Sequence, residues 1–225
     1  MVILQACSNV KQSGWWQPWA NTLLYLPLNT TDTYTDKSWN NVTTTNQWVT
    51  FGTYQWVDCW IFAWNRSNWQ IVVTPFAITA SSTILFWCYM TWYDESDAHI
   101  ISLKNSSGQY VIWAYETEWF YGKKINNNIA TRSYSINQWV LCAFTTVWGN
   151  WNIYLLWNNL SATQQWTVTS GSYTPQYFAI WNIADGSLNR HFQWGMSNVI
   201  VENKTWTQQE ISDYFDSTKS LYWIS

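Results

Sequence analysis

Glycine is scarce in this chain: 8 of its 225 residues are glycine, whereas 22 are tryptophan. An average protein has about 7% glycine and far less tryptophan than this. Many indoles stand inside turn-like sequences, such as Ser38–Asn41 and Leu156–Asn159, in which every other residue suits a turn. Turns often need a positive φ, which glycine adopts freely and a bulky residue adopts only under strain. The composition therefore predicts a gene that reads the codon UGA as glycine, so that many printed tryptophans are glycine in the native protein. The alternative is that the tryptophans are genuine, as in an aromatic-rich protein.

Charge is also scarce, since only 10% of the residues are Asp, Glu, Lys or Arg and the formal net charge is −3. This composition leaves no basic surface to attract nucleic acid, which is excluded as a partner. No apolar run reaches the roughly 18 residues that a membrane-spanning helix needs. Membrane insertion is therefore not expected.

The four cysteines lack the spacing of a metal site, because no CxxC motif or Cys/His cluster occurs. Cys88 and Cys142 fall inside apolar, strand-like runs, which predicts two buried thiols. A disulfide among Cys7, Cys59, Cys88 and Cys142 is left open.

Short strand-like segments recur along the chain, separated by clusters of threonine, asparagine, serine and glycine. This pattern predicts an all-β protein built as an antiparallel sandwich or barrel. One short helix is expected near residues 207–216, where Thr207 and Glu210 form a capping-box pattern and apolar residues follow at helical spacing. The expected strands cover residues 23–28, 70–73, 84–93, 99–103, 110–115, 139–147, 152–156, 177–180 and 196–202.

The chain is expected to form one domain over residues 22–225, because sandwiches reach this length without splitting. Residues 1–21 are expected to form a flexible amino-terminal segment or linker. With tryptophan read as glycine, Ser13–Asn21 has the glycine, serine, glutamine and proline content of a flexible linker.

Several motifs follow one another in an order that matches a known family. The opening strand Leu23–Leu28 precedes Asp36–Asn41, and the last part of the chain carries Phe178–Asn182, Phe192–Asn203 and Thr207–Ile211. Between them stand Phe62–Ile71, Pro75–Ile78, Ile84–Met90, Asn137–Phe144 and Asn152–Trp157. Over roughly residues 22–219 the chain thus resembles the concanavalin A-like lectin/glucanase superfamily, in particular its bacterial laminin G-like domains. The resemblance implies a jelly-roll β-sandwich of two antiparallel sheets, with ligands bound on the concave face and its rim loops.

The match to the family's motifs also indicates which tryptophans stand in place of glycine. Those that stand where the family has glycine are Trp39, Trp64, Trp157, Trp181 and Trp194, whereas Trp87, Trp139 and Trp206 stand where a large residue is accepted. The resemblance and the recoding therefore support each other. The indoles expected at turn tips, exposed or on a strained backbone, are those of Trp39, Trp64, Trp69, Trp157 and Trp181.

Glycosidases of this superfamily resemble one another in a Glu-x-Asp-x-x-Glu strand, which this sequence lacks. The nearest substitute is Glu116 with Glu118, whose i, i+2 spacing would point both carboxylates to one side of a strand. Two solvated surface acids are the alternative. His191 is a further candidate for ligand binding, although it has no partner at metal spacing and a surface role explains it equally.

Asp94, Glu95 and Asp97 put three carboxylates into one loop. Oxygen-rich loops hold Ca²⁺ in several lectin-like proteins, so these residues are the candidate calcium ligands, with a solvated turn as the alternative. The spacing matches no EF-hand. Asp36 is expected to build its own turn through bonds from its side chain to the backbone.

The resemblance, together with the missing carboxylate signature, implies a non-catalytic extracellular binding module. Its expected partner is a glycan or a cell-surface glycoprotein, and its expected location is a cell or virion surface. Two alternatives stay open, a divergent glycoside hydrolase and a structural domain of a surface or phage-tail protein without a ligand. Calcium is the one cofactor that the sequence suggests.

Overall fold

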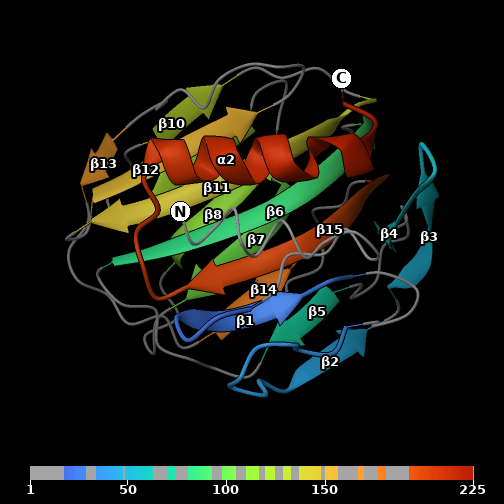
Figure 1. Ribbon diagram of the computed structural model, residues 1–225, viewed down its shortest axis with the longest axis horizontal. Coiled ribbons are helices and arrows are strands. Elements are labelled where there is room, and N and C mark those ends of the chain that lie inside the picture. Colours follow the sequence, from blue (N-terminus) through green and yellow to red (C-terminus); the bar gives the residue numbers. More distant parts are fainter. Residues whose placement is uncertain are drawn as a thin grey trace.

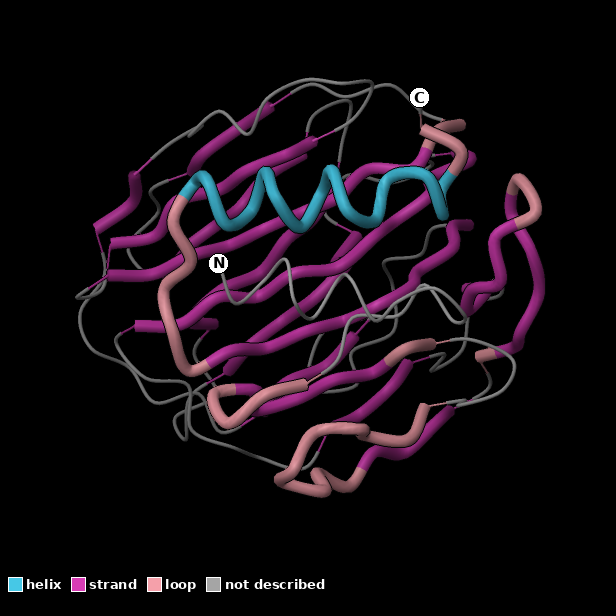
Figure 2. The backbone as a smooth tube through the Cα atoms, viewed as in Figure 1, coloured by secondary structure: helices cyan, strands magenta, loops and turns pink. Residues whose placement is uncertain are grey.

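The computed structural model describes residues 18–28, 34–47, 49–62, 70–73, 81–92, 98–104, 110–116, 120–124, 129–132, 137–147, 150–156, 167–169, 177–180 and 193–224. Two antiparallel sheets form two layers, and one helix lies across the outer face of one of them (Figure 1). The tube in Figure 2 shows the same arrangement, with strands making up most of the described chain. This confirms the predicted all-β sandwich with one short C-terminal helix.

The first sheet has eight strands. Its order is β13 (Thr167–Thr169), β12 (Asn150–Leu156), β11 (Trp139–Val147), β6 (Ser81–Trp92), β15 (Gln193–Glu202), β4 (Val57–Phe62) and β3 (Thr50–Tyr54), with β1 (Thr22–Leu26) also paired to β15. The second sheet has seven strands in the order β10 (Ile129–Arg132), β9 (Phe120–Lys124), β8 (Tyr110–Glu116), β7 (Ala98–Lys104), β14 (Tyr177–Ile180), β5 (Gln70–Val73) and β2 (Thr44–Gln47).

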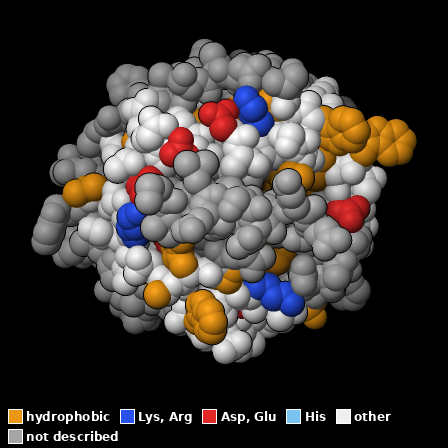
Figure 3. All heavy atoms as spheres, in the orientation of Figure 1, with side chains coloured by type: hydrophobic (Ala, Val, Ile, Leu, Met, Phe, Trp, Pro, Cys, Tyr) orange, Lys and Arg blue, Asp and Glu red, His pale blue; other side chains and the backbone are white. Residues whose placement is uncertain are grey.

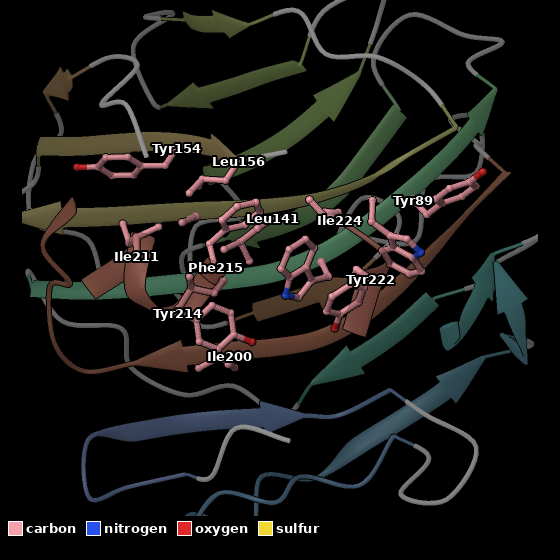
Figure 4. Close-up of a cluster of buried hydrophobic side chains, with 14 of the residues drawn as sticks. Tyr89, Leu141, Tyr154, Leu156, Ile200, Ile211, Tyr214, Phe215, Tyr222 and Ile224 are labelled. Carbon is pink, nitrogen blue, oxygen red and sulfur yellow. The ribbon is translucent and has the colours of Figure 1, made fainter. Parts of the chain in front are cut away.

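The central strands of the first sheet are buried on both faces. On one face of β6, Leu85, Trp87 and Tyr89 belong to a hydrophobic cluster that includes the helix residues (Figure 4). The alternate residues Phe86 and Cys88 are equally inaccessible, at 0% exposure, and successive side chains of a strand point to opposite faces. Burial on both faces explains why these strands are nearly continuous apolar runs in the sequence.

The two predicted buried thiols are confirmed. Cys88 and Cys142 are fully buried and form no disulfide, with their sulfur atoms 3.5 Å apart on neighbouring strands. Cys59 is also a buried free thiol, and burial raises its pKa to about 12. A thiol of this kind stays protonated at neutral pH and is a poor nucleophile.

The helix α2 (Gln208–Thr218) begins where the capping box predicts. The Thr207 side chain accepts from the Glu210 backbone, and the Glu210 side chain accepts from the Thr207 backbone at 2.7 Å. The inward face carries Ile211, Tyr214 and Phe215, as the sequence predicts, and packs on the eight-stranded sheet (Figure 4). A 3₁₀ turn, η1 (Lys219–Tyr222), follows directly.

A bulge in β15 ties both ends of the domain together. Asn198 has a positive φ of 50° and donates from its backbone to Pro27 and from its side chain to the Tyr222 hydroxyl at 2.7 Å. The Tyr222 hydroxyl donates in turn to Ser197 at 3.2 Å. The segment after β1 and the turn after α2 are therefore held to the same strand.

Candidate functional site

The residues that the sequence nominates for chemistry fall largely outside the described part of the chain. Glu116 is the last residue of β8, and its backbone pairs with Ala98 of β7 and Phe120 of β9. The others, Glu118, His191, Asp94, Glu95 and Asp97, lie outside the described residues. Their roles in ligand, acid/base or calcium binding stay predictions, as does the flexible segment over residues 1–21, of which only the last few residues are described.

Asp36 is a buried carboxylate that accepts four hydrogen bonds. The donors are the backbone N–H groups of Tyr25 (2.9 Å), Ser38 (2.9 Å) and Val42 (2.7 Å), and the Ser38 hydroxyl (2.7 Å). Its hydrogen-bonding capacity is thus used to shape the loop after β1. The predicted structural role of Asp36 is confirmed.

Glu202 is the second buried carboxylate, with 0% exposure at the end of β15. The Trp19 indole N–H donates to one of its oxygens, and the Thr22 hydroxyl donates to the other at 2.7 Å. Burial raises the pKa of Glu202. Both oxygens serve to attach residues 19–22 to β15, so this acid has a structural role.

Two exposed tryptophans lie at one end of the sandwich in the described part of the chain. We call it the hairpin end and define it by Gln55, Trp56, Asn137 and Trp223. Trp56 is 86% exposed at the turn between β3 and β4, and Trp223 is 70% exposed just after η1. In Figure 3 exposed hydrophobic side chains gather on the side where the β3–β4 hairpin and the C terminus lie in Figure 1.

Direct contacts join the parts of the hairpin end. The Gln55 side-chain amide donates to the Asn137 carbonyl at 3.2 Å, and the Trp139 indole N–H donates to the Tyr54 carbonyl at 3.3 Å. The Trp139 ring also lies 5.0 Å from the Tyr222 ring. Trp139 therefore connects the residue next to Gln55 with the residue next to Trp223.

A continuous run of aromatic rings supports this end from within. Tyr54 stacks on Tyr89 at 5.0 Å, and Tyr89 lies 5.6 Å from Trp139. Beyond Tyr222, the rings continue to Trp87 at 4.0 Å. Packed rings at such separations form a rigid support for whatever the hairpin end presents to solvent.

As printed, the hairpin end offers two exposed indoles beside amide groups, a combination that can stack on a sugar ring and hydrogen-bond its hydroxyls. Neither indole was predicted from the sequence to be exposed. At the first of them, Gln55–Trp56 does not resemble a hairpin turn, because its second residue is tryptophan. If these positions are glycine, the indole platform does not exist. Trp39, by contrast, was predicted to be exposed at a turn and is, at 77%.

The described residues contain no cluster of three or more metal-ligating side chains. Neither helical segment in the described part has the length or apolarity to span a bilayer. The features found in the described residues are two buried carboxylates with structural roles, Asp36 and Glu202, and the exposed indoles of the hairpin end.

Comparison with known proteins finds likeness at the level of structure. No protein-family model and no curated protein sequence matches the chain. Botulinum neurotoxin type C, whose cell entry depends on interaction with two ganglioside molecules, matches with a TM-score of 0.67 at 19% identity, over 88% of this chain and 51% of that chain. The binding domain of botulinum neurotoxin DC in complex with rat synaptotagmin II matches with a TM-score of 0.66 at 19% identity, over 88% of this chain and 52% of that chain.

A Trypanosoma rangeli sialidase matches with a TM-score of 0.67 at 11% identity, over 91% of this chain and 34% of that chain. The chain therefore spans about half the length of the neurotoxin chains and about a third of the sialidase. At these identities the likeness establishes a shared jelly-roll-like β-sandwich fold.

Proposed function

We propose that this chain is a non-catalytic binding module of the concanavalin A-like superfamily, with a laminin G-like domain that recognises a glycan or a glycoprotein. The observation that carries the proposal is the match, over 88% of the chain, to a neurotoxin that interacts with gangliosides and to a binding domain held in complex with synaptotagmin. The motifs of the concanavalin A-like pattern in the sequence support it independently.

The setting that suits this function is extracellular, on a cell or virion surface, where gangliosides and glycoproteins are displayed. Sialylated oligosaccharides are the first ligands to try, because the sugar part of a ganglioside is what protrudes from a membrane. The candidate ligand residues are Glu116, Glu118 and His191. Asp94, Glu95 and Asp97 are the candidate Ca²⁺ ligands.

Two alternative functions are a glycoside hydrolase and a structural spacer domain. The sialidase among the structural matches favours a hydrolase, which would use Glu116 and Glu118 as its carboxylate pair. A spacer domain of a surface or phage-tail protein would use neither residue. The described acids Asp36 and Glu202 do not favour the hydrolase, since both are committed to structural hydrogen bonds.

A glycan array tests the proposal, with protein purified from its native host so that every codon is read as the host reads it. The array carries ganglioside oligosaccharides and neutral glycans and is run with Ca²⁺ and with a chelator. Binding to at least one oligosaccharide without product release is the expected result. Absence of binding in both conditions removes glycan recognition.

Matched variants separate the remaining outcomes. Asp97→Asn should weaken binding in Ca²⁺ if the loop holds the ion, whereas Asp213→Asn, which removes an exposed carboxylate on α2, should not. Hydrolysis of an array glycan that is lost in Glu116→Gln would replace the binding module with the hydrolase.

We also propose that the gene reads UGA as glycine. The ratio of 22 tryptophans to 8 glycines supports it, as does the exposure of Trp39 at a turn. An intact mass of the native protein that equals the mass of the printed sequence would rule it out.

A further inference from the structure

Seven of the described tryptophans lie at the two extremes of exposure, whereas Trp19 is partly buried. Four indoles are at most 2% exposed, those of Trp60, Trp87, Trp139 and Trp206. Three are at least 70% exposed, those of Trp39, Trp56 and Trp223. The backbone conformation divides them in nearly the same way, because Trp56 and Trp223 have a positive φ and the four buried tryptophans do not.

Trp56 is the second residue of a two-residue hairpin turn. Tyr54 pairs with Val57, and the two residues between them have φ values of 47° for Gln55 and 65° for Trp56. Two consecutive positive φ values define a type I′ turn, whose second position favours glycine strongly, as in Asn-Gly. The indole is 86% exposed, so burial does not compensate the strain of this conformation.

Trp223 closes the C-terminal 3₁₀ turn in the left-handed conformation, with φ 57° and ψ 27°. Its backbone N–H bonds back to the carbonyls of Lys219 and Ser220. This is the position after a helical end at which glycine is most enriched, because glycine has no Cβ to oppose a left-handed backbone. Here too the indole, 70% exposed, gains little by packing.

The buried indoles are in the opposite situation. Trp87 stacks between Tyr222 at 4.0 Å and Phe215 at 5.6 Å. Trp139 bridges Tyr89 and Tyr222 and donates its N–H to the hairpin. Glycine at either position would leave a void the size of an indole beneath α2 and η1, which a packed core does not tolerate.

We infer that positions 56 and 223 are UGA codons read as glycine, and that positions 87 and 139 are UGG codons read as tryptophan. The inference rests on the proposed reassignment and deepens it, since it says which tryptophans are genuine. It has a consequence for recognition, because the two indoles of the hairpin end are then absent from the native protein. The hairpin end is a glycine turn beside a glycine-capped 3₁₀ turn, and it is not an aromatic platform for sugars.

The test is tandem mass spectrometry of peptides from the protein purified from its host, together with the four codons in the gene. We expect glycine at 56 and 223 and tryptophan at 87 and 139. Tryptophan at all four positions overturns this inference, and it overturns the reassignment as well if the gene has UGA at any of them.

Other results separate the two proposals. Glycine at 87 or 139 keeps the reassignment and overturns the division of codons drawn from the structure. Tryptophan encoded by UGG at 56 or 223, with glycine found at UGA codons elsewhere in the chain, does the same.

Discussion

Replacing Trp56 by glycine should stabilise the chain as printed. A bulky residue in the left-handed region costs about 1–2 kcal/mol relative to an unstrained one, and glycine removes that cost. Glycine also gives the unfolded chain more freedom, which offsets about 0.5–1 kcal/mol of the gain. Because the indole is 86% exposed, little burial is lost, and the net gain in the free energy of unfolding is about 0.5–1 kcal/mol.

Trp139→Gly should do the opposite. Its indole is 1% exposed, and truncating a buried tryptophan costs about 3–5 kcal/mol before the added cost of glycine in a strand. Urea denaturation of recombinant protein with UGG at each tryptophan measures both effects as shifts in the midpoint at constant slope.

Trp39→Gly is the matched control, because this indole is 77% exposed on a backbone without a positive φ. It should be neutral or slightly destabilising. If Trp56→Gly lowers the midpoint as much as Trp39→Gly does, the turn does not need glycine and the reasoning from φ is wrong.

Tyr222→Phe should lower the free energy of unfolding by about 1–3 kcal/mol, because it removes the acceptor of the buried Asn198 amide. Urea denaturation measures the loss, and Leu221→Ala, which shortens an exposed side chain, is the control. Asp36→Ala should lower the free energy of unfolding by about 3 kcal/mol or more, because four hydrogen-bond donors lose the carboxylate that accepts from them. If Asp36→Ala lowers it no more than the control Asp213→Ala, the loop does not depend on Asp36. Burial raises the pKa of Glu202 above its ordinary 4.5. The free energy of unfolding of the wild type should therefore fall as the pH rises from 4.5 through the raised pKa of the folded state. Glu202→Gln should lack this fall. In thermal melts at several pH values, the melting temperature of the variant relative to that of the wild type should rise toward neutral pH.

The fold could be predicted where the residues carry a strong local signal. Burial on both faces makes β6 and β11 continuous apolar runs, and the capping box at Thr207 marks the start of α2. The helix face was predictable from the spacing of Ile211 and Phe215 alone.

The edge of the sheet was harder to predict. β3 is short, half exposed and polar, so it lacks a periodic apolar signal, and the hairpin to β4 is concealed because tryptophan stands at the glycine position of its turn. β2, β9, β10 and β13 were also missed, because strands of three to five residues are too short to show a clear alternation in the sequence.

The candidate site was less accessible to sequence reasoning than the fold. Carboxylates that form a site are brought together by tertiary contacts. The turn sequence around Asp36 indicated its structural role, but nothing in the sequence separated the structural Glu202 from the candidates Glu116 and Glu118. Glu202 is identified as structural only through Trp19 and Thr22, about 180 residues away along the chain.

One measurement tests most directly that this sandwich is a binding module whose recognition does not depend on exposed tryptophan. Two recombinant proteins, one as printed and one with Trp56→Gly and Trp223→Gly, are compared on the same array of sialylated and neutral oligosaccharides. We expect both proteins to bind the same glycans with similar affinity. Binding by the printed protein alone would make the two indoles the ligand platform and would contradict this expectation.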